Sequence, residues 1–276
     1  LARAQGLLRR RQQTTRRQQD YESRLQSMVD QLSTHERDLE AALSFQESLL
    51  GRLRPRPGVN IAAEHRFCET MGGDFYDILD AGDGTTALLM ADVSGHGVPA
   101  ALVTGMLKAQ IRASEHRREP AEFLKDVNRH LFPTLSVKGQ FLTAAYAVID
   151  PRSETLAYAS AGHNPLAVVR RDTELEEYGS TGFPVGMLEE LDVAGGSLQL
   201  EGGDAVWLYT DGLFECPGPR GRGYGRHALL ELIREARHAD VDRWARTVFS
   251  TCQDFLGGHP PADDMTVVCA VAAPGS

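Results

Sequence analysis

Apolar residues recur with a seven-residue spacing over the first part of the chain. When Leu25 is placed at position a of a heptad, the apolar residues at a and d are Leu7, Tyr21, Leu25, Met28, Leu32, Leu39, Ala42, Leu49 and Leu53. A repeat of this kind is typical of a helix in a coiled coil. Polar residues also fall on the seam and weaken it, namely Arg11, Thr14, Gln18, His35 and Gln46. We expect a parallel homodimer; the alternatives are a solvated single helix and a helix packed on its own following domain.

A run of proline and glycine separates this pattern from the rest of the chain. Pro55, Pro57 and Gly58 lie within five residues of one another, and prolines end helices because they lack the N–H donor. The sequence therefore predicts a helical coiled-coil linker over residues 1–53 and a globular domain over residues 54–276.

The globular part alternates between strand-like and helix-like patterns. Strands are predicted over residues 60–67, 86–93, 141–149, 155–160, 166–170, 196–200, 205–210 and 265–272. Helices are predicted over residues 98–114, 122–132, 225–237 and 240–256. Many strands with helices in pairs indicate a layered α+β domain.

The charge is unevenly placed along the chain. The formal net charge is −9, yet the first 17 residues hold six arginines and no acid, so the remainder is strongly acidic. An acidic domain disfavours bulk binding to nucleic acid or anionic membranes and suits cations. No apolar run approaches the roughly 20 residues of a membrane span. The chain begins at Leu1 and not at Met, so we expect a fragment of a longer protein.

The four cysteines are spread over the chain at positions 68, 216, 252 and 269. They form no CxxC pair, which argues against a zinc site or a disulfide framework. Unpaired cysteines are typical of a reducing cytosol, and we predict a cytoplasmic protein.

Acidic residues stand where predicted buried strands end. Asp74, Asp92, Asp211 and the pair Asp263-Asp264 each adjoin an apolar run and are flanked by glycine or other turn residues. Buried carboxylates are costly unless they are hydrated, hydrogen-bonded or paired with cations, and oxygen ligands suit Mg²⁺ or Mn²⁺. A single Asp-Gly after a strand is more often only a turn, so the sequence spacing leaves open whether the four sites converge.

Six short segments together resemble a known family. They are GGDFYD at 72–77, ADVSGHGVPAAL at 91–102, FLTAAYAVID at 141–150, SAGHNP at 160–165, LYTDGLFE at 208–215 and DDMTVV at 263–268. In this order they resemble the bacterial PP2C-like (PPM) serine/threonine phosphatases of the RsbU/SpoIIE type. The resemblance covers about residues 55–272.

The resemblance implies an α+β fold of two packed antiparallel sheets flanked by helices, with two divalent cations, Mn²⁺ or Mg²⁺, between the sheets. It implies that Asp92 bridges both ions and that Val93 offers its carbonyl oxygen. Asp74 would serve the second ion, and Asp211 and Asp263 the first. Asp77, His96, His163 and Asp264 remain candidates for contacts to the ligands or to the substrate.

The resemblance does not assign a clear role to two of these candidates, His96 and His163. His96 lies four residues after Asp92, whereas many eukaryotic relatives have a histidine two residues after the bridging aspartate, so no acid role is carried over to it. His163 stands before Asn164-Pro165, and the reading that we favour is a histidine that holds a tight turn.

The resemblance implies that a metal-activated water attacks the phosphate of a phosphoserine in a STAS-type anti-sigma-factor antagonist, within a partner-switching pathway. It also implies a sensory domain upstream of the helix, which would regulate the enzyme through the dimer. The sequence has neither a Cys-x5-Arg loop nor a GxxxxGK[ST] loop, which disfavours cysteine-based phosphatases and P-loop nucleotide hydrolases. The alternatives are a catalytically weak phosphatase-like scaffold that binds a partner and a metal phosphohydrolase acting on small phosphate esters.

Overall fold

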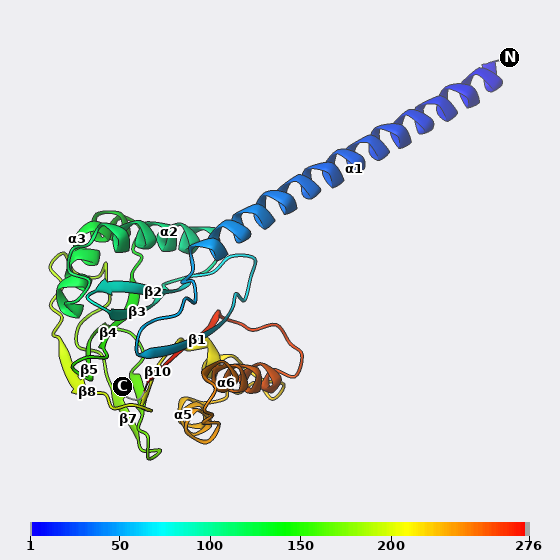
Figure 1. Ribbon diagram of the computed structural model, residues 1–276. Coiled ribbons are helices and arrows are strands. Elements are labelled where there is room, and N and C mark those ends of the chain that lie inside the picture. Colours follow the sequence, from blue (N-terminus) through cyan, green and yellow to red (C-terminus); the bar gives the residue numbers. More distant parts are fainter. Residues whose placement is uncertain (1, 274–276) are drawn as a thin grey trace. The chain divides into compact units, whose positions relative to one another are not determined.

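Figure 1 shows the protein as a computed structural model, which describes the backbone of residues 2–273. Side chains are described for residue 21 and residues 24–273, so the predicted seam positions Leu7, Arg11, Thr14 and Gln18 lie outside them. The chain divides into two compact units, Leu1–Phe45 and Gln46–Ser276. Within the described residues, every helix is too short or too polar to traverse a bilayer.

The first unit is part of one long helix, α1 (Ala2–Leu49). Most of its large apolar side chains from residue 21 onward are exposed, and these are Tyr21, Leu25, Met28, Val29, Leu32, Leu39 and Phe45. Apolar residues exposed at heptad positions are what a coiled-coil partner would cover. The coiled coil itself stays a prediction.

The last turn of α1 belongs to the second unit, and the helix ends earlier than the predicted residue 53. It stops at Leu49 because Gly51 leads the chain against strand β2 (Asp74–Gly82): the Gly51 N–H donates to the Tyr76 carbonyl at 2.9 Å. A Cβ on Gly51 would lie 2.9 Å from the Asp77 Cα, so only glycine fits this approach. Leu53, placed on the seam by the heptad, therefore lies outside the helix.

Gln46 corrects the heptad in a second way. The repeat puts it on the seam, but its side chain is buried within the second unit. Its Nε2 donates to the Gly72 carbonyl at 2.7 Å, and its Oε1 accepts from the Gly72 N–H at 3.3 Å. The heptad pattern therefore ends before Gln46, because this side chain is used to hold the loop that precedes β2.

Two five-stranded antiparallel sheets form the second unit. The first has the order β1-β10-β9-β6-β7, and its strands are β1 (Val59–Arg66), β10 (Met265–Ala272), β9 (Ala205–Tyr209), β6 (Leu166–Val169) and β7 (Leu175–Tyr178). The second has the order β2-β3-β4-β5-β8, and its strands are β2 (Asp74–Gly82), β3 (Thr85–Val93), β4 (Leu142–Asp150), β5 (Thr155–Ala161) and β8 (Gly196–Gln199).

The central strands are apolar throughout because both of their faces are buried. On β3, Leu88 and Met90 belong to the core between the two sheets, and Leu89 belongs to the core under the helices. On β9, Val206 and Leu208 face the other sheet in the same way, while the neighbouring Trp207 packs outward. This period of two decides which side chains enter the space between the sheets.

Helices cover the outer face of each sheet (Figure 1). The β2-β3-β4-β5-β8 sheet is covered by α2 (Val98–Ala113) and α3 (Pro120–Lys138), with Phe123 stacked on Tyr146. The other sheet is covered by α5 (Arg226–Glu235) and α6 (Val241–Phe255), with Trp244 packed edge-on against Trp207. The short α4 (Gly212–Glu215) follows β9. The result is the layered α+β fold that the sequence predicts.

The structure adds strands β2 and β7, which the sequence pattern missed, and it extends the second predicted helix past Pro133 to Lys138. Strand β2 was missed because Asp74, Asp77 and Asp80 interrupt its apolar residues. It is an edge strand paired with β3 alone, and an edge position tolerates such polar residues.

Candidate metal centre

All four of the predicted carboxylate sites lie at one end of the space between the sheets. Asp92 follows Leu88 and Met90 at the spacing of two, so it points between the sheets. Asp74 begins β2 and lies directly opposite Asp92 in the β2–β3 register. Two acidic side chains thus approach from the same sheet.

Two threonines of the opposite sheet donate hydrogen bonds to Asp74. Thr210, just after β9, donates from Oγ1 to Asp74 Oδ2 at 2.8 Å, and Thr266 on β10 donates to the same oxygen at 2.5 Å. Thr210 immediately precedes Asp211, and Thr266 follows the Asp263-Asp264 pair. These hydrogen bonds join residues that lie far apart in the sequence and bring the ends of β9 and β10 to Asp74.

The acidic groups raise one another's pKa. Burial, with the charges of Asp211 and Asp263, raises the pKa of Asp92 to about 7. Burial and the charge of Asp92 raise the pKa of Asp74 well above its usual range, although its two threonine hydrogen bonds act in the opposite direction. The pKa values of Asp211 and Asp263 are raised in the same way, mainly by burial. The cluster therefore holds more negative charge than its own surroundings stabilise.

Asp264 has a different environment from its neighbours. Its two carboxylate oxygens accept hydrogen bonds from the backbone N–H groups of Cys68 and Gly73, both at 2.8 Å, and of Asp74 at 3.2 Å. A Cβ on Gly72 would lie 1.8 Å from Asp264 Oδ2, so this carboxylate occupies the space that glycine leaves. Asp264 thus fixes the loop before β2 and has little capacity left for a metal ion.

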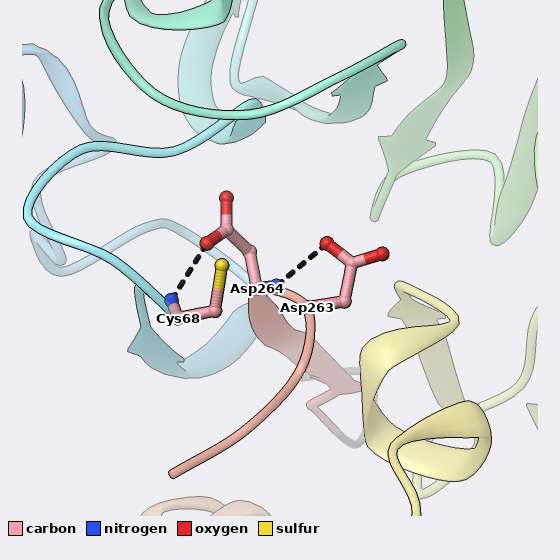
Figure 2. A group of neighbouring side chains, drawn as sticks. All are labelled: Cys68, Asp263 and Asp264. Atoms are coloured by element: carbon pink, nitrogen blue, oxygen red, sulfur yellow. Dashed lines mark hydrogen bonds between the residues drawn. The ribbon is translucent and has the colours of Figure 1, made fainter.

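Figure 2 shows Cys68, Asp263 and Asp264, whose ligand atoms lie within 4.8 Å of one another. This group is a poor metal site by itself, because the oxygens of Asp264 are committed to backbone donors. Burial and the nearby Asp264 charge also raise the pKa of the Cys68 thiol to about 12, and a protonated thiol is a weak ligand. Asp263 is the member of the group that remains available to the wider carboxylate cluster.

The donor set fits hard divalent cations. Asp74, Asp92, Asp211 and Asp263 supply oxygen atoms alone, and oxygen ligands suit Mg²⁺ and Mn²⁺. A carbonyl oxygen can join them, since a Cβ on Gly73 would lie only 2.6 Å from the Val93 carbonyl, and glycine leaves that carbonyl accessible. A pair of cations would offset the repulsion that raises the pKa values of these groups.

Comparison with known proteins identifies the family of this domain. Residues 82–272 match the family described as Stage II sporulation protein E (SpoIIE). The chain belongs to the SpoIIE family. A curated relative, "Phosphoserine phosphatase RsbU" from Bacillus subtilis (strain 168), is 29% identical over 224 residues, which are 79% of this chain and 66% of that protein.

Solved structures match the fold of this SpoIIE-family domain. The "SiaA-PP2C domain of Pseudomonas aeruginosa" has a TM-score of 0.74 at 24% identity, over 87% of this chain and 97% of that one. The RsbU and RsbW domains of Rv1364c from Mycobacterium tuberculosis match with a TM-score of 0.66 at 29% identity, over 80% of this chain and 62% of that one. The PP2C-like arrangement of two antiparallel sheets with flanking helices is confirmed.

Three of the remaining predicted site residues lie in other surroundings. Asp77 is buried on the outer face of the sheet, where Lys108 of α2 donates to it at 2.7 Å. His96 is exposed and lies 3.2 Å from Glu69. His163 is buried, with Nδ1 2.8 Å from the Thr143 hydroxyl, and burial lowers its pKa to about 4.

The sequence analysis missed several residues that position the cluster in this SpoIIE-family domain. Thr210 and Thr266 were passed over, although each lies within three residues of a predicted ligand. His65 on β1 extends the chain of contacts, with Nδ1 2.8 Å from the Thr266 hydroxyl. A hydroxyl in register with a strand-end aspartate is the signal that could have identified the threonines; for His65 the sequence holds no comparable signal.

Proposed function

We propose that this chain is a divalent-metal-dependent protein phosphatase that hydrolyses phosphoserine or phosphothreonine. The convergence of Asp74, Asp92, Asp211 and Asp263 at one end of the space between the sheets is the observation that carries the proposal. Membership of the SpoIIE family supports it, and so does the relative named a phosphoserine phosphatase. The chain spans 66% of that relative, so its activity is assigned here to this domain.

In this proposal Asp74, Asp92, Asp211 and Asp263, together with the Val93 carbonyl, would hold two Mg²⁺ or Mn²⁺ ions. Asp92 would be the ligand shared by both ions, Asp74 would serve one of them, and Asp211 and Asp263 would serve the other. When bound, such a pair of ions supplies a nucleophilic water at neutral pH and stabilises the charge that develops on the phosphoryl oxygens.

Neighbouring residues of the chain hold the carboxylate cluster in place. The hydroxyls of Thr210 and Thr266 fix one oxygen of Asp74, which orients the carboxylate toward the space between the sheets. Asp264 holds the loop before β2 through the backbone N–H groups of Gly73 and Asp74. Ligands that are fixed in advance lose less entropy when a cation binds, and mutation of such supporting residues weakens metal sites.

Phosphate release from a phosphoserine protein, measured with added Mn²⁺, tests the proposal. We expect Asp92→Asn and Asp211→Asn to lower kcat/KM by at least about a hundredfold, because an electrostatic contribution of this kind is worth several kcal/mol. Asp254→Asn on the exposed face of α6 is the matched control and should retain wild-type activity. Wild-type turnover by Asp92→Asn would overturn the proposal. Partner binding without turnover by the wild-type chain would support the scaffold alternative.

We propose further that the substrate is a phosphorylated STAS-domain protein in a partner-switching pathway. The resemblance to the RsbU/SpoIIE type supports this substrate class. Phosphate release from a panel of phosphorylated STAS proteins, compared with a phosphoserine peptide and a nucleoside monophosphate, tests it. Faster turnover of the peptide or the nucleotide than of every STAS protein would contradict it.

The long helix supports a proposal about regulation. The exposed apolar side chains Leu25, Met28 and Leu32 fit a homodimeric coiled coil, through which an upstream sensory domain would act. The four free thiols are consistent with a protein that functions in a reducing cytoplasm. Deletion of residues 1–45 should then change both the oligomeric state and the basal rate of phosphate release, and unchanged values for both would refute this regulation.

A further inference from the structure

A basic cavity lies outside the carboxylate cluster, on the outer side of the β2-β3-β4-β5-β8 sheet. It is lined by residues from the end of α1, the following segment, β2 and α2, and its volume is about 420 Å³. Six cationic side chains line it: Arg52, Arg54, Arg56, Lys108, Arg112 and Arg117. We call this feature the basic pocket.

The charge of the basic pocket opposes that of the whole chain. The chain carries −9, but the pocket has two acids, Asp77 and Asp80, beside its six cations. Asp77 is already paired with Lys108 at 2.7 Å, and Asp80 lies 3.8 Å from Arg56. Positive charge therefore remains after the internal pairs are formed.

The unpaired charge lies on three exposed arginines. Among the described residues, no acidic group forms an ion pair with Arg52, Arg54 or Arg112. Like charges gathered at one concave place repel one another and raise the local potential, which an anion would offset.

Two guanidinium nitrogens give an independent sign of an absent acceptor. The Nε atoms of Arg56 and Arg117 are buried and have no hydrogen-bond partner in the described structure. Both side chains are otherwise fixed, since Arg56 donates to the Ile78 carbonyl at 3.2 Å and Arg117 donates to the Arg112 carbonyl at 2.7 Å. Buried donors are seldom left unsatisfied, and a small movement of either side chain would expose its Nε to an acceptor in the pocket.

The lining also contains apolar side chains from the segment after α1, from β2 and from α2. Leu50, Leu79 and Ile111 line the same cavity as the arginines. A volume of about 420 Å³ falls within the range of sites for small organic ligands. Arginine forks match phosphate geometry, and the apolar residues suit a carbon-rich portion.

We propose that the basic pocket binds a small phosphate-bearing organic anion of about nucleotide size. Such a ligand would contact the segment after α1, strand β2 and helix α2 together. The site is separate from the carboxylate cluster, because Asp77 and Lys108 lie on the outer face of the sheet whereas Asp74 points between the sheets.

Calorimetric titration of the full chain with ATP, AMP, pyrophosphate and adenosine tests the proposal. Each titration is done with Mg²⁺ in excess of the ligand and repeated in EDTA. We expect ATP and AMP to bind in both buffers, pyrophosphate to bind more weakly, and adenosine not to bind. Binding that survives EDTA excludes the carboxylate cluster as its location.

Arg54→Glu and Arg112→Glu should each weaken nucleotide binding about tenfold or more, as expected for the loss of one charged contact. Both side chains are exposed, so folding should be retained, and the melting temperature checks this. Exposed Arg220→Glu is the matched control and should bind as the wild type does. Equal affinities in all variants, no binding by any of the four ligands, or binding of polyglutamate in place of the nucleotides would overturn the proposal.

Discussion

Asp74 and Asp92 lie directly opposite each other on the neighbouring antiparallel strands β2 and β3. Like charges at opposed positions destabilise a sheet, and here both side chains point into the same buried space. Asp211 and Asp263 add to the repulsion from the other sheet. The fold therefore carries a local electrostatic cost that protons or cations relieve.

Removal of one of these charges should stabilise the metal-free protein. The pKa of Asp92 is about 7 in the folded chain against an ordinary value of 3.8, so the folded state binds this proton more tightly than the unfolded state. The stability that protonation contributes is therefore present at low pH and is lost as the pH rises through about 7. In EDTA at high pH, Asp92→Asn should raise the free energy of unfolding by on the order of 2–4 kcal/mol, with less than about half of that gain near pH 5.

Urea denaturation of both proteins at the two pH values measures this difference. The buried His65 and His163, whose pKa values are lowered to about 4, have the opposite pH dependence but titrate alike in both proteins and cancel. A wild-type chain that is as stable as Asp92→Asn at high pH would show that the carboxylates do not repel one another as described.

Divalent cations should stabilise the wild-type chain strongly. At about a hundred times its dissociation constant a cation adds about 2.7 kcal/mol, which raises the melting temperature by roughly 5–10 °C for a domain of this size. The shift should be larger at pH 8 than at pH 6, because protons compete with cations for carboxylates of raised pKa. Thermal unfolding with and without Mn²⁺ measures it, and Asp92→Asn combined with Asp211→Asn should show no shift.

Thr266→Val should weaken cation binding while keeping the side chain's shape. It removes the 2.5 Å hydrogen bond to Asp74 and the contact with His65. Loss of a group that orients a metal ligand typically costs about 10- to 100-fold in affinity. The Mn²⁺ concentration for half-maximal phosphate release reports it. Thr247→Val, exposed on α6, is the control, and an unchanged Mn²⁺ requirement in Thr266→Val would refute the orienting role.

Gln46→Leu should destabilise the second unit. Leucine fills a similar volume but leaves the Gly72 carbonyl and N–H without the partners that Gln46 provides at 2.7 and 3.3 Å. Each buried group left unsatisfied costs about 1–3 kcal/mol, so we expect a loss of about 2–4 kcal/mol. Urea denaturation measures it. Gln31→Leu, at an exposed position of the same helix, should change stability by less than about 0.5 kcal/mol.

The exposed apolar face of α1 should set the oligomeric state. A Leu25→Glu, Leu32→Glu double variant places charges at two a positions, and charges there disfavour a coiled coil. Light scattering after size exclusion should report a dimer for the wild type and a monomer for this variant. Arg24→Glu with Gln31→Glu, one residue away from the seam, should remain a dimer. A monomeric wild type would rule out the dimer.

The positions of the apolar strands along the chain could be predicted, because burial on both faces leaves a run of apolar residues. Strands β3 and β9 contain such runs; Asp92 is the penultimate residue of β3, and Asp211 lies two residues after β9. Strand β2 could not be recognised, since Asp74, Asp77 and Asp80 interrupt its apolar pattern and each makes a different kind of contact. Asp74 faces the other sheet, Asp77 pairs with Lys108, and Asp80 caps the turn at Gly82.

The site was only partly predictable for a related reason. A short motif does not distinguish Asp74 from Asp77, although the pleat sends them to opposite faces of one strand. The heptad likewise assigned Gln46 to a seam, because a periodicity cannot register a contact with Gly72 26 residues away. Contacts of this kind form only when segments far apart in the sequence come together in the fold, so a local sequence pattern does not reveal them.

Two of the backbone amides that donate to Asp264 link the two sheets. Asp264 precedes β10, while Asp74 is the first residue of β2 and Gly73 lies directly before it. Deuterium can replace these two amide protons only when the β2 end of the domain separates from β10. Their exchange rates would therefore report how often the space around the carboxylates opens, and this measurement requires no substrate.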